Sequence, residues 1–181
     1  NATGQDFQAS PKPLWTLIYY VAADNDLTEV LPHKLRYLHH AGTNQNANIV
    51  ALVDFSGGQA RYMIFGPDAP PSIAQGELST GRPETLRDFV EWAQDSYPAE
   101  HYALIFDDHG HGHTGCAYDE DAPADQEDCA GTSCLALKEW REALSQVDDI
   151  DVIQMTACLM GSIESAYQLR SLADYYVASE A

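Results

Sequence analysis

Four continuous apolar runs dominate the pattern of hydrophobic and polar positions along the chain. They are rich in aromatic and β-branched residues and lack strict alternation, which predicts strands buried on both faces of a sheet. These strands are expected at residues 14–26, 47–55, 101–107 and 151–159, with a fifth strand at 174–181. An edge or hairpin strand is expected at 60–66, after two consecutive glycines.

Segments with helical periodicity separate these runs. The first helix is expected to carry Leu27, Leu31, Leu35 and Leu38 on one face, with Asp26 or Thr28 as its candidate N-cap and Gly42 as its end. Pro32 limits this helix to starting near that residue. Further helices are expected at 82–94, 137–147 and 161–172. Buried strands that alternate with amphipathic helices predict an α/β fold, with a largely parallel sheet flanked by helices.

The length and composition favour one domain with a substantial core. The chain has 181 residues, of which 45% are hydrophobic, and this excludes general disorder. Residues 1–13, polar with two prolines, are expected to form a flexible lead-in to a domain at 14–181. Within that domain, residues 116–134 read as an acidic loop.

Reactive side chains gather where the predicted strands end. In α/β sheets, ligands bind at the carboxyl ends of the strands. These ends carry Asp24, Asn25, Asp26, Asp54, residues 107–113, residues 158–161, Ser179 and Glu180. Every α/β fold places polar residues there, so their concentration indicates a site without defining its chemistry.

Cys158 and His109 are the candidate catalytic pair. A cysteine nucleophile needs a thiolate, which a nearby imidazolium or a helix N-terminus favours. His109 follows the third buried strand and Cys158 follows the fourth, directly before a predicted helix, so the two meet if these strands are neighbours. The backbone amides of Gly110 and Cys158 are the expected oxyanion donors. The alternatives are a buried core cysteine and a histidine in a solvated turn.

The segment "IFDDHGHGH" at 105–113 also permits a metal site. Closely spaced His109, His111 and His113 beside two aspartates are typical of zinc or iron ligands. The sequence offers no matching ligand cluster elsewhere, which counts against a metal site. Because of the spacing, a metal-dependent hydrolase built on these three histidines is still kept as an alternative.

The charge of the chain limits its partners. Twenty-eight acidic and nine basic residues give a formal net charge of −19, which argues against nucleic acid and anionic membranes. No apolar run approaches the length of about eighteen residues that a membrane span needs. The charge would suit cationic ligands, calcium or an extracellular setting. Asp119, Asp121 and Asp125 are candidate calcium ligands, although their segment lacks the order of an EF-hand.

The cysteines and the N-terminus bear on the compartment. Cys116, Cys129 and Cys134 lie close together in the sequence, so one disulfide among them is expected. The chain opens at Asn1 without a methionine, which is compatible with removal of an export signal. A secreted or cell-envelope location is expected.

Three segments carry a family pattern: "WTLIYYVAADNDL" at 15–27, "PETLRDFVEWAQDSYPAEHYALIFDDHGHG" at 83–112 and "TACLMGSIESAYQLRSLADYYVASE" at 156–180. In their order and spacing they resemble the clostripain family of cysteine endopeptidases, which share the caspase and gingipain type of fold. The resemblance implies a caspase-like sheet, with His109 and Cys158 as the catalytic dyad. It also implies a polypeptide substrate cut after a basic residue, maturation by self-cleavage and, in some members, calcium for activation or stability. No cofactor is expected for the chemistry.

Two departures from the family pattern matter. The family usually places an aspartate of its acidic specificity pocket two residues before the cysteine, and here that position is Thr156, which leaves the basic preference open. The family's catalytic domain also continues beyond the segment matched by Ala181. This implies an incomplete sheet here and, as a partner, a second chain from the same precursor.

The resemblance and the strand ends together select further residues. Asp24, Asn25, Thr156 and Glu180 are the expected substrate-binding residues. A non-catalytic caspase-like interaction module is the other alternative, which Thr156 permits. Intact His109 and Cys158 favour the peptidase over that module.

Overall fold

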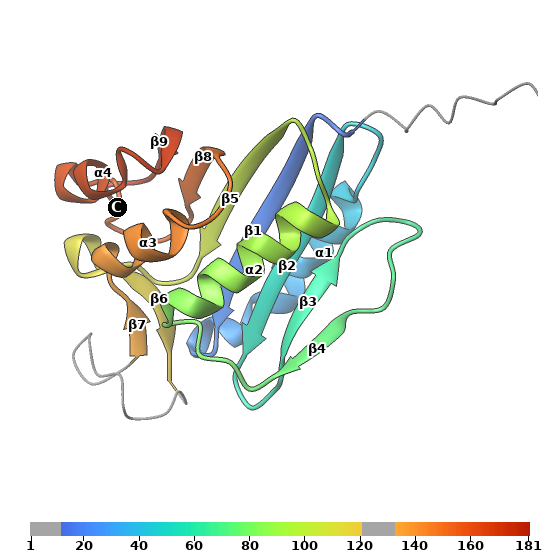
Figure 1. The fold of residues 1–181 in the computed structure, drawn as a ribbon. Coiled ribbons are helices and arrows are strands. Elements are labelled where there is room, and N and C mark those ends of the chain that lie inside the picture. Colours follow the sequence, from blue (N-terminus) through green and yellow to red (C-terminus); the bar gives the residue numbers. More distant parts are fainter. Residues whose placement is uncertain (1–11, 121–132) are drawn as a thin grey trace, which may run out of the picture.

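A seven-stranded sheet forms the centre of the molecule in the computed structural model, which describes residues 12–120 and 133–181. The strand order is β4-β3-β2-β1-β5-β8-β9 (Figure 1). Five strands run parallel: β1 (Trp15–Ala23), β2 (Ala47–Phe55), β5 (His101–Asp107), β8 (Ile150–Met155) and β9 (Ala173–Val177). At one edge, β3 (Ala60–Ile64) and β4 (Ile73–Gly76) add antiparallel pairs. The largely parallel sheet predicted from the apolar runs is confirmed.

Helices cover both faces of this sheet, as Figure 1 shows. The helices α2 (Pro83–Ser96) and α3 (Leu137–Leu144) share one hydrophobic core with Tyr20 and Phe106, and α1 (Leu31–Ala41) packs on the other face with Val21. The two cores follow from the strand geometry, because successive side chains of β1 point to opposite faces. Phe106 stacks on Trp140 of α3 with ring centroids 3.8 Å apart. The predicted αβα sandwich is confirmed.

The first helix begins beside Pro32, as expected, but the capping residue before it differs from the expectation. A short 3-10 helix, η1 (Asp26–Glu29), precedes α1, and its N-cap is Asn25 rather than Asp26 or Thr28. Asn25 takes this role because its side-chain oxygen accepts a hydrogen bond from the N–H of Leu27 at 2.9 Å. Asp26 is thereby left with its carboxylate free to face another part of the molecule.

The short strands β4, β6 and β7 are not predicted from the sequence, and the bounds of β8 and α4 differ from the prediction. The segment 116–134, expected as a loop, begins with β6 (Cys116–Asp119) and ends in β7 (Ser133–Leu135), which pair antiparallel. These strands and β4 are too short to give a periodic signal in the sequence. The fourth buried strand ends at Met155, and the following helix α4 is limited to Ile163–Leu169.

The lead-in, the absence of a membrane span and the disulfide can be compared with the described residues only in part. Most of the lead-in 1–13 lies outside the described residues. No helix in the described ranges has the length and apolar character needed to cross a membrane. Cys134 is disulfide-bonded, Cys116 and Cys158 carry free thiols, and Cys129 lies outside the described residues.

Candidate active site

The parallel register brings the ends of β5 and β8 to the same edge of the sheet. Phe106 near the end of β5 is level with Met155 at the end of β8. The N–H of Thr156 donates to the carbonyl of Phe106 at 2.8 Å and extends this pairing past β8. The segment with His109 therefore leaves the sheet beside the segment with Cys158, which is the arrangement that the candidate pair needs.

Gly110 makes the contact between these two segments. A Cβ atom at this position would collide with the carbonyl oxygen of Cys158 and lie 2.9 Å from the Cβ of Ala157. No larger residue fits this approach unless the backbone moves. The absence of a side chain at Gly110 thus allows the histidine segment to lie directly against the cysteine segment.

The thiol of Cys158 is free and exposed. Leu159, the next residue, has a φ of +62°, which is unusual for a residue other than glycine. The turn is held by β9 and the residues after it: Tyr176 donates its hydroxyl to the carbonyl of Met160 at 2.7 Å, and the N–H of Gly161 donates to Ser179 at 2.7 Å. The strained turn therefore presents the thiol at the surface.

Cys158 does not lie at a helix N-terminus. The N-cap of α4 is Ser162, whose hydroxyl accepts from the N–H of Ser165. Leu159, Met160 and Gly161 separate Cys158 from that cap. The predicted activation of the thiol by the helix is wrong, because the strand ends earlier and the helix begins later than the apolar pattern suggested.

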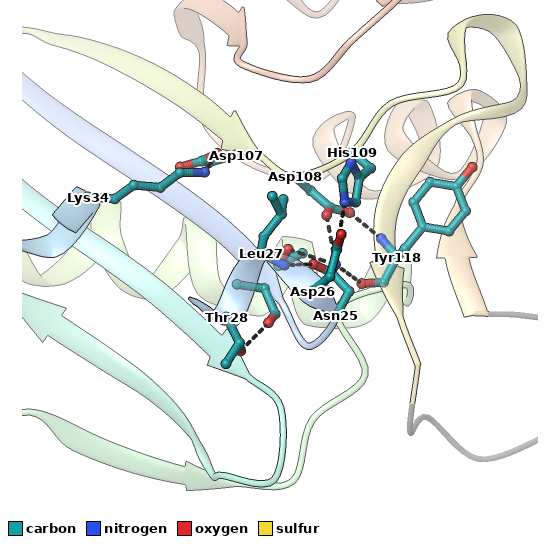
Figure 2. A network of polar contacts seen from close by, with 11 residues as sticks. Asn25, Asp26, Leu27, Thr28, Lys34, Asp107, Asp108, His109 and Tyr118 are labelled. Atoms are coloured by element: carbon teal, nitrogen blue, oxygen red, sulfur yellow. Dashed lines mark hydrogen bonds and ion pairs between the residues drawn. The ribbon is translucent and has the colours of Figure 1, made fainter. Parts of the chain in front are cut away.

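His109 contacts a carboxylate from η1, the 3-10 helix that follows β1. Its Nε2 lies 2.6 Å from Oδ1 of Asp26 (Figure 2). The hydrogen bond with His109 lowers the pKa of the Asp26 carboxyl. The side chain of His109 is 41% exposed, so the ring is also open to solvent. Among the described residues, no hydrogen bond joins His109 to Cys158 directly.

Asp108, next to His109, is the centre of a buried network. Its carboxylate accepts from the side-chain amide of Asn25 at 2.8 Å and from the N–H of Tyr118 at 2.5 Å. Asn25 also donates to the carbonyl of Tyr118 at 3.2 Å, as Figure 2 shows. Burial raises the pKa of Asp108 to about 7 against the opposing effect of these hydrogen bonds. The network fixes the end of β1, the end of β5 and β6 to one another.

The predicted substrate-binding residues occupy different environments. Asp24 and Asn25 are 1% and 5% exposed, and the amide group of Asn25 is used within the protein. The hydroxyl of Thr156 donates to the carbonyl of Phe106. Glu180 is exposed and lines a cavity of about 610 Å³. Of these four residues, Glu180 is the one that the structure places in a cavity beside the candidate pair.

That cavity is built from three segments near the candidate pair. His111 and His113 come from the histidine segment, Leu159 follows Cys158, and Glu164 belongs to the first turn of α4. Glu164 and Glu180 give the cavity two carboxylates. Leu159 is half exposed and adds an apolar surface. The cavity can therefore accept a side chain that combines an apolar stem with a positive charge.

Two of the three histidines of the segment contact different residues. His109 contacts Asp26, and the ring of His111 lies edge-on to Tyr118 with centroids 4.8 Å apart. Within residues 12–120 and 133–181, no group of three or more histidine, cysteine, aspartate or glutamate side chains is arranged to hold a metal ion. The described structure gives no support to the metal-dependent hydrolase.

The candidate calcium ligands are only partly described. Asp119 is 1% exposed in β6 and accepts from the N–H of Thr80 at 2.8 Å. Asp121 and Asp125 lie outside the described residues. A carboxylate that is buried and bonded to the backbone fits a structural role, and the calcium prediction rests on the other two residues.

Comparisons with known proteins give the family of the chain. The sequence model of the clostripain family matches residues 19–181. The chain belongs to the clostripain family. Clostripain from Hathewaya histolytica is 28% identical over 193 residues, which cover 86% of this chain and 36% of that protein. The resemblance drawn from the sequence is thereby confirmed.

Solved structures of clostripain-like C11 proteases share the fold. A secreted C11 cysteine protease from Bacteroides thetaiotaomicron, bound to an irreversible peptide inhibitor, has a TM-score of 0.75 at 24% identity over 93% of this chain. An inactive zymogen C11 protease from Parabacteroides distasonis has a TM-score of 0.71 at 25% identity over 94% of this chain. The match covers 49% of each of those chains. This member of the clostripain family therefore spans about half the length of these structures.

Proposed function

We propose that the protein is a cysteine endopeptidase in which Cys158 is the nucleophile and His109 the general acid and base. The observation that carries the proposal is the contact of Gly110 with the carbonyl of Cys158, because it places an exposed thiol and an exposed imidazole on adjoining segments. Membership of the clostripain family supports it. On this proposal, residues 14–181 are the N-terminal part of the catalytic domain.

The geometry suggests which ring nitrogen exchanges protons with the thiol. Asp26 occupies Nε2 of His109, so Nδ1 is the nitrogen left for the reaction. In acylation, Cys158 gives its proton to His109, and the thiolate attacks the carbonyl carbon of the scissile peptide bond. When the C–N bond breaks, His109 returns the proton to the departing amine and a thioester remains.

Deacylation uses the same two residues. His109 takes a proton from a water molecule as that water attacks the thioester carbonyl. The C–S bond then breaks, the carboxylic product leaves, and Cys158 recovers its proton. In both steps, the backbone N–H groups of Gly110 and Cys158 would stabilise the oxyanion, because both belong to the contacting segments.

The cavity beside the pair supports a preference for a basic residue before the scissile bond. Glu164 and Glu180 line it together with the apolar side chain of Leu159, which suits the long stem and charge of lysine or arginine. Thr156 lacks the carboxylate expected at its position and bonds to Phe106. The acidic function of the pocket would therefore reside in the two glutamates.

Maturation by proteolysis and a second chain from the same precursor are part of the proposal. Support comes from the Parabacteroides distasonis relative, which is described as an inactive zymogen. The acidic segment 116–134 contains no lysine or arginine. A cut after a basic residue would consequently fall outside that segment.

An extracytoplasmic location and a calcium requirement complete the proposal. The disulfide at Cys134 supports export, because such bonds persist in oxidising compartments. A related protease from Bacteroides thetaiotaomicron is described as secreted. Calcium would act on activation or stability rather than on the reaction itself.

The decisive experiment is cleavage of a positional peptide library by the complete protein, with and without calcium. We expect cleavage after lysine or arginine, and no cleavage by the Cys158→Ala variant. Activity that survives this substitution would overturn the assignment of the nucleophile. Cleavage confined to other residues would remove the basic preference while leaving the peptidase in place.

Thiol alkylation supplies a matched control within the same chain. Cys158 is exposed, whereas Cys116 is fully buried and burial raises its pKa well above the ordinary value. Iodoacetamide is therefore expected to modify Cys158 first and to abolish activity with one equivalent incorporated. Mass spectrometry of the modified peptide would identify the residue, and full activity after modification of Cys158 would contradict the mechanism.

A further inference from the structure

Asp26 and His109 form a close pair between segments that are far apart in the sequence. Oδ1 of Asp26 lies 2.6 Å from Nε2 of His109, across a sequence separation of 83 residues. Both atoms are at the edge of the sheet where β1 and β5 end, and Figure 2 shows the two side chains directed at each other. The pair lies beside the proposed reaction centre rather than at a remote surface.

The backbone on both sides of this pair is fixed. Asn25, immediately before Asp26, donates to Asp108, immediately before His109, at 2.8 Å. Asn25 also caps the 3-10 helix that carries Asp26, by accepting from the N–H of Leu27. The hydroxyl of Thr28 bonds to the carbonyl of Ala23 at 2.6 Å and closes the same turn. Asn25 and Asp26 thus face Asp108 and His109. The buried hydrogen bond between Asn25 and Asp108 holds the exposed pair of Asp26 and His109 in register.

We infer that Asp26 is a positioning residue that orients the imidazole of His109 and stabilises its protonated form during catalysis. The inference rests on the proposed role of His109 as the acid and base. The hydrogen bond lowers the pKa of Asp26, so the group is a carboxylate throughout the neutral range. A carboxylate on Nε2 fixes the tautomer that leaves Nδ1 to exchange protons with the thiol.

The exposure of the pair sets the size of the expected effect. An aspartate that orients a catalytic histidine in a buried triad contributes about 10⁴-fold to kcat. The Asp26 side chain is 80% exposed, and solvent competes with such a contact. We therefore expect a loss of about tenfold in kcat, with little change in KM, when the carboxylate is removed.

The test compares Asp26→Asn with Glu29→Gln in the complete protein. Glu29 is an exposed carboxylate in the same 3-10 helix, so its variant makes the same change of charge without touching His109. Asp26→Asn is expected to lower kcat about tenfold and to move the acidic limb of the pH profile to lower pH, because the imidazolium loses its partner and the free imidazole that accepts the proton forms at lower pH. Glu29→Gln should change neither quantity, and Asp26→Glu should recover part of the lost activity.

The outcomes separate this inference from the function on which it rests. Unchanged kcat and pH profile in Asp26→Asn, with an inactive Cys158→Ala variant, would overturn the role of Asp26 and keep the peptidase. A faster Asp26→Asn enzyme would overturn it too, because the contact would then restrain His109. Activity in Cys158→Ala would instead overturn the proposed function. Thermal unfolding of Asp26→Asn beside Glu29→Gln controls for folding, since both sites are exposed.

Discussion

Gly110 lies against the carbonyl oxygen of Cys158 with no room for a side chain between them. The residue after the proposed base therefore touches the proposed nucleophile through the backbone. This relationship defines the distance between the two segments of the candidate pair more directly than a side-chain contact would, because Gly110 has no rotamer that could relax it. It also determines where an oxyanion held by the N–H of Gly110 would lie.

A methyl group at this contact should separate the segments. Gly110→Ala is expected to lower kcat/KM about a hundredfold, since displacing a reacting group by about 1 Å has an effect of that order. The overpacking should also reduce the free energy of unfolding by about 1–3 kcal/mol. Gly57→Ala is the control, because its φ of +67° strains a side chain but nothing lies within 4 Å. Equal activities of the two variants would contradict the close approach.

The carboxylate of Glu180 should affect selectivity more than chemistry. Glu180→Gln removes one of the two negative charges of the cavity beside Leu159, so kcat/KM for peptides with lysine or arginine before the scissile bond is expected to fall about tenfold. Peptides with an uncharged residue there should be cut as before. Glu142→Gln, at an exposed position on α3, is the control. An equal fall for charged and uncharged peptides would remove Glu180 from the specificity pocket.

The buried carboxyl of Asp108 should leave a signature in the pH dependence of stability. Burial raises its pKa to about 7, so the folded protein binds a proton that the unfolded chain has released. Between about pH 4 and pH 7, its contribution to the free energy of unfolding is therefore lost as pH rises, by up to about 1.4 kcal/mol per pH unit. Below this window the contribution is fully present.

Denaturant unfolding of the wild type and of Asp108→Asn across this range would measure the effect. Other titrating groups cancel in the difference between the two proteins. The variant also changes the hydrogen bonds to Asn25 and Tyr118, which adds an offset that is nearly independent of pH. A difference with no slope between pH 4 and pH 7 would show that Asp108 keeps an ordinary pKa.

The sheet could be predicted from the sequence because its strands are buried on both faces. The runs at 47–55 and 101–107 match β2 and β5 at both ends, since each is continuous and followed by a change to polar residues. The end of β8 could not be placed, because Ala157 and Met160 are apolar and buried but belong to the turn around Cys158. Periodicity does not separate an apolar strand from an apolar turn.

The ends of the predicted strands indicate the candidate pair of His109 and Cys158. They do not indicate which side chains contact this pair. Which strands are neighbours determines which of these ends meet, and the sequence pattern alone left that open. The Asn25–Asp108 and Asp26–His109 contacts each span 83 residues, and no local signal distinguishes these side chains from the other polar residues at the edge. The polar residues that follow the first apolar run are the available clue, but their pattern indicates substrate binding for Asp24 and Asn25 and a helix cap for Asp26.

The hydrogen bonds of Asp108 connect β6 to the residue that precedes the proposed catalytic base. One oxygen of Asp108 is held by Asn25, and the other by the N–H of Tyr118 in β6, the strand that leads into the acidic residues. A shift of β6 would withdraw one donor from the residue that immediately precedes His109. The imidazole of His109 would then respond to a movement of β6 through the single carboxylate of Asp108.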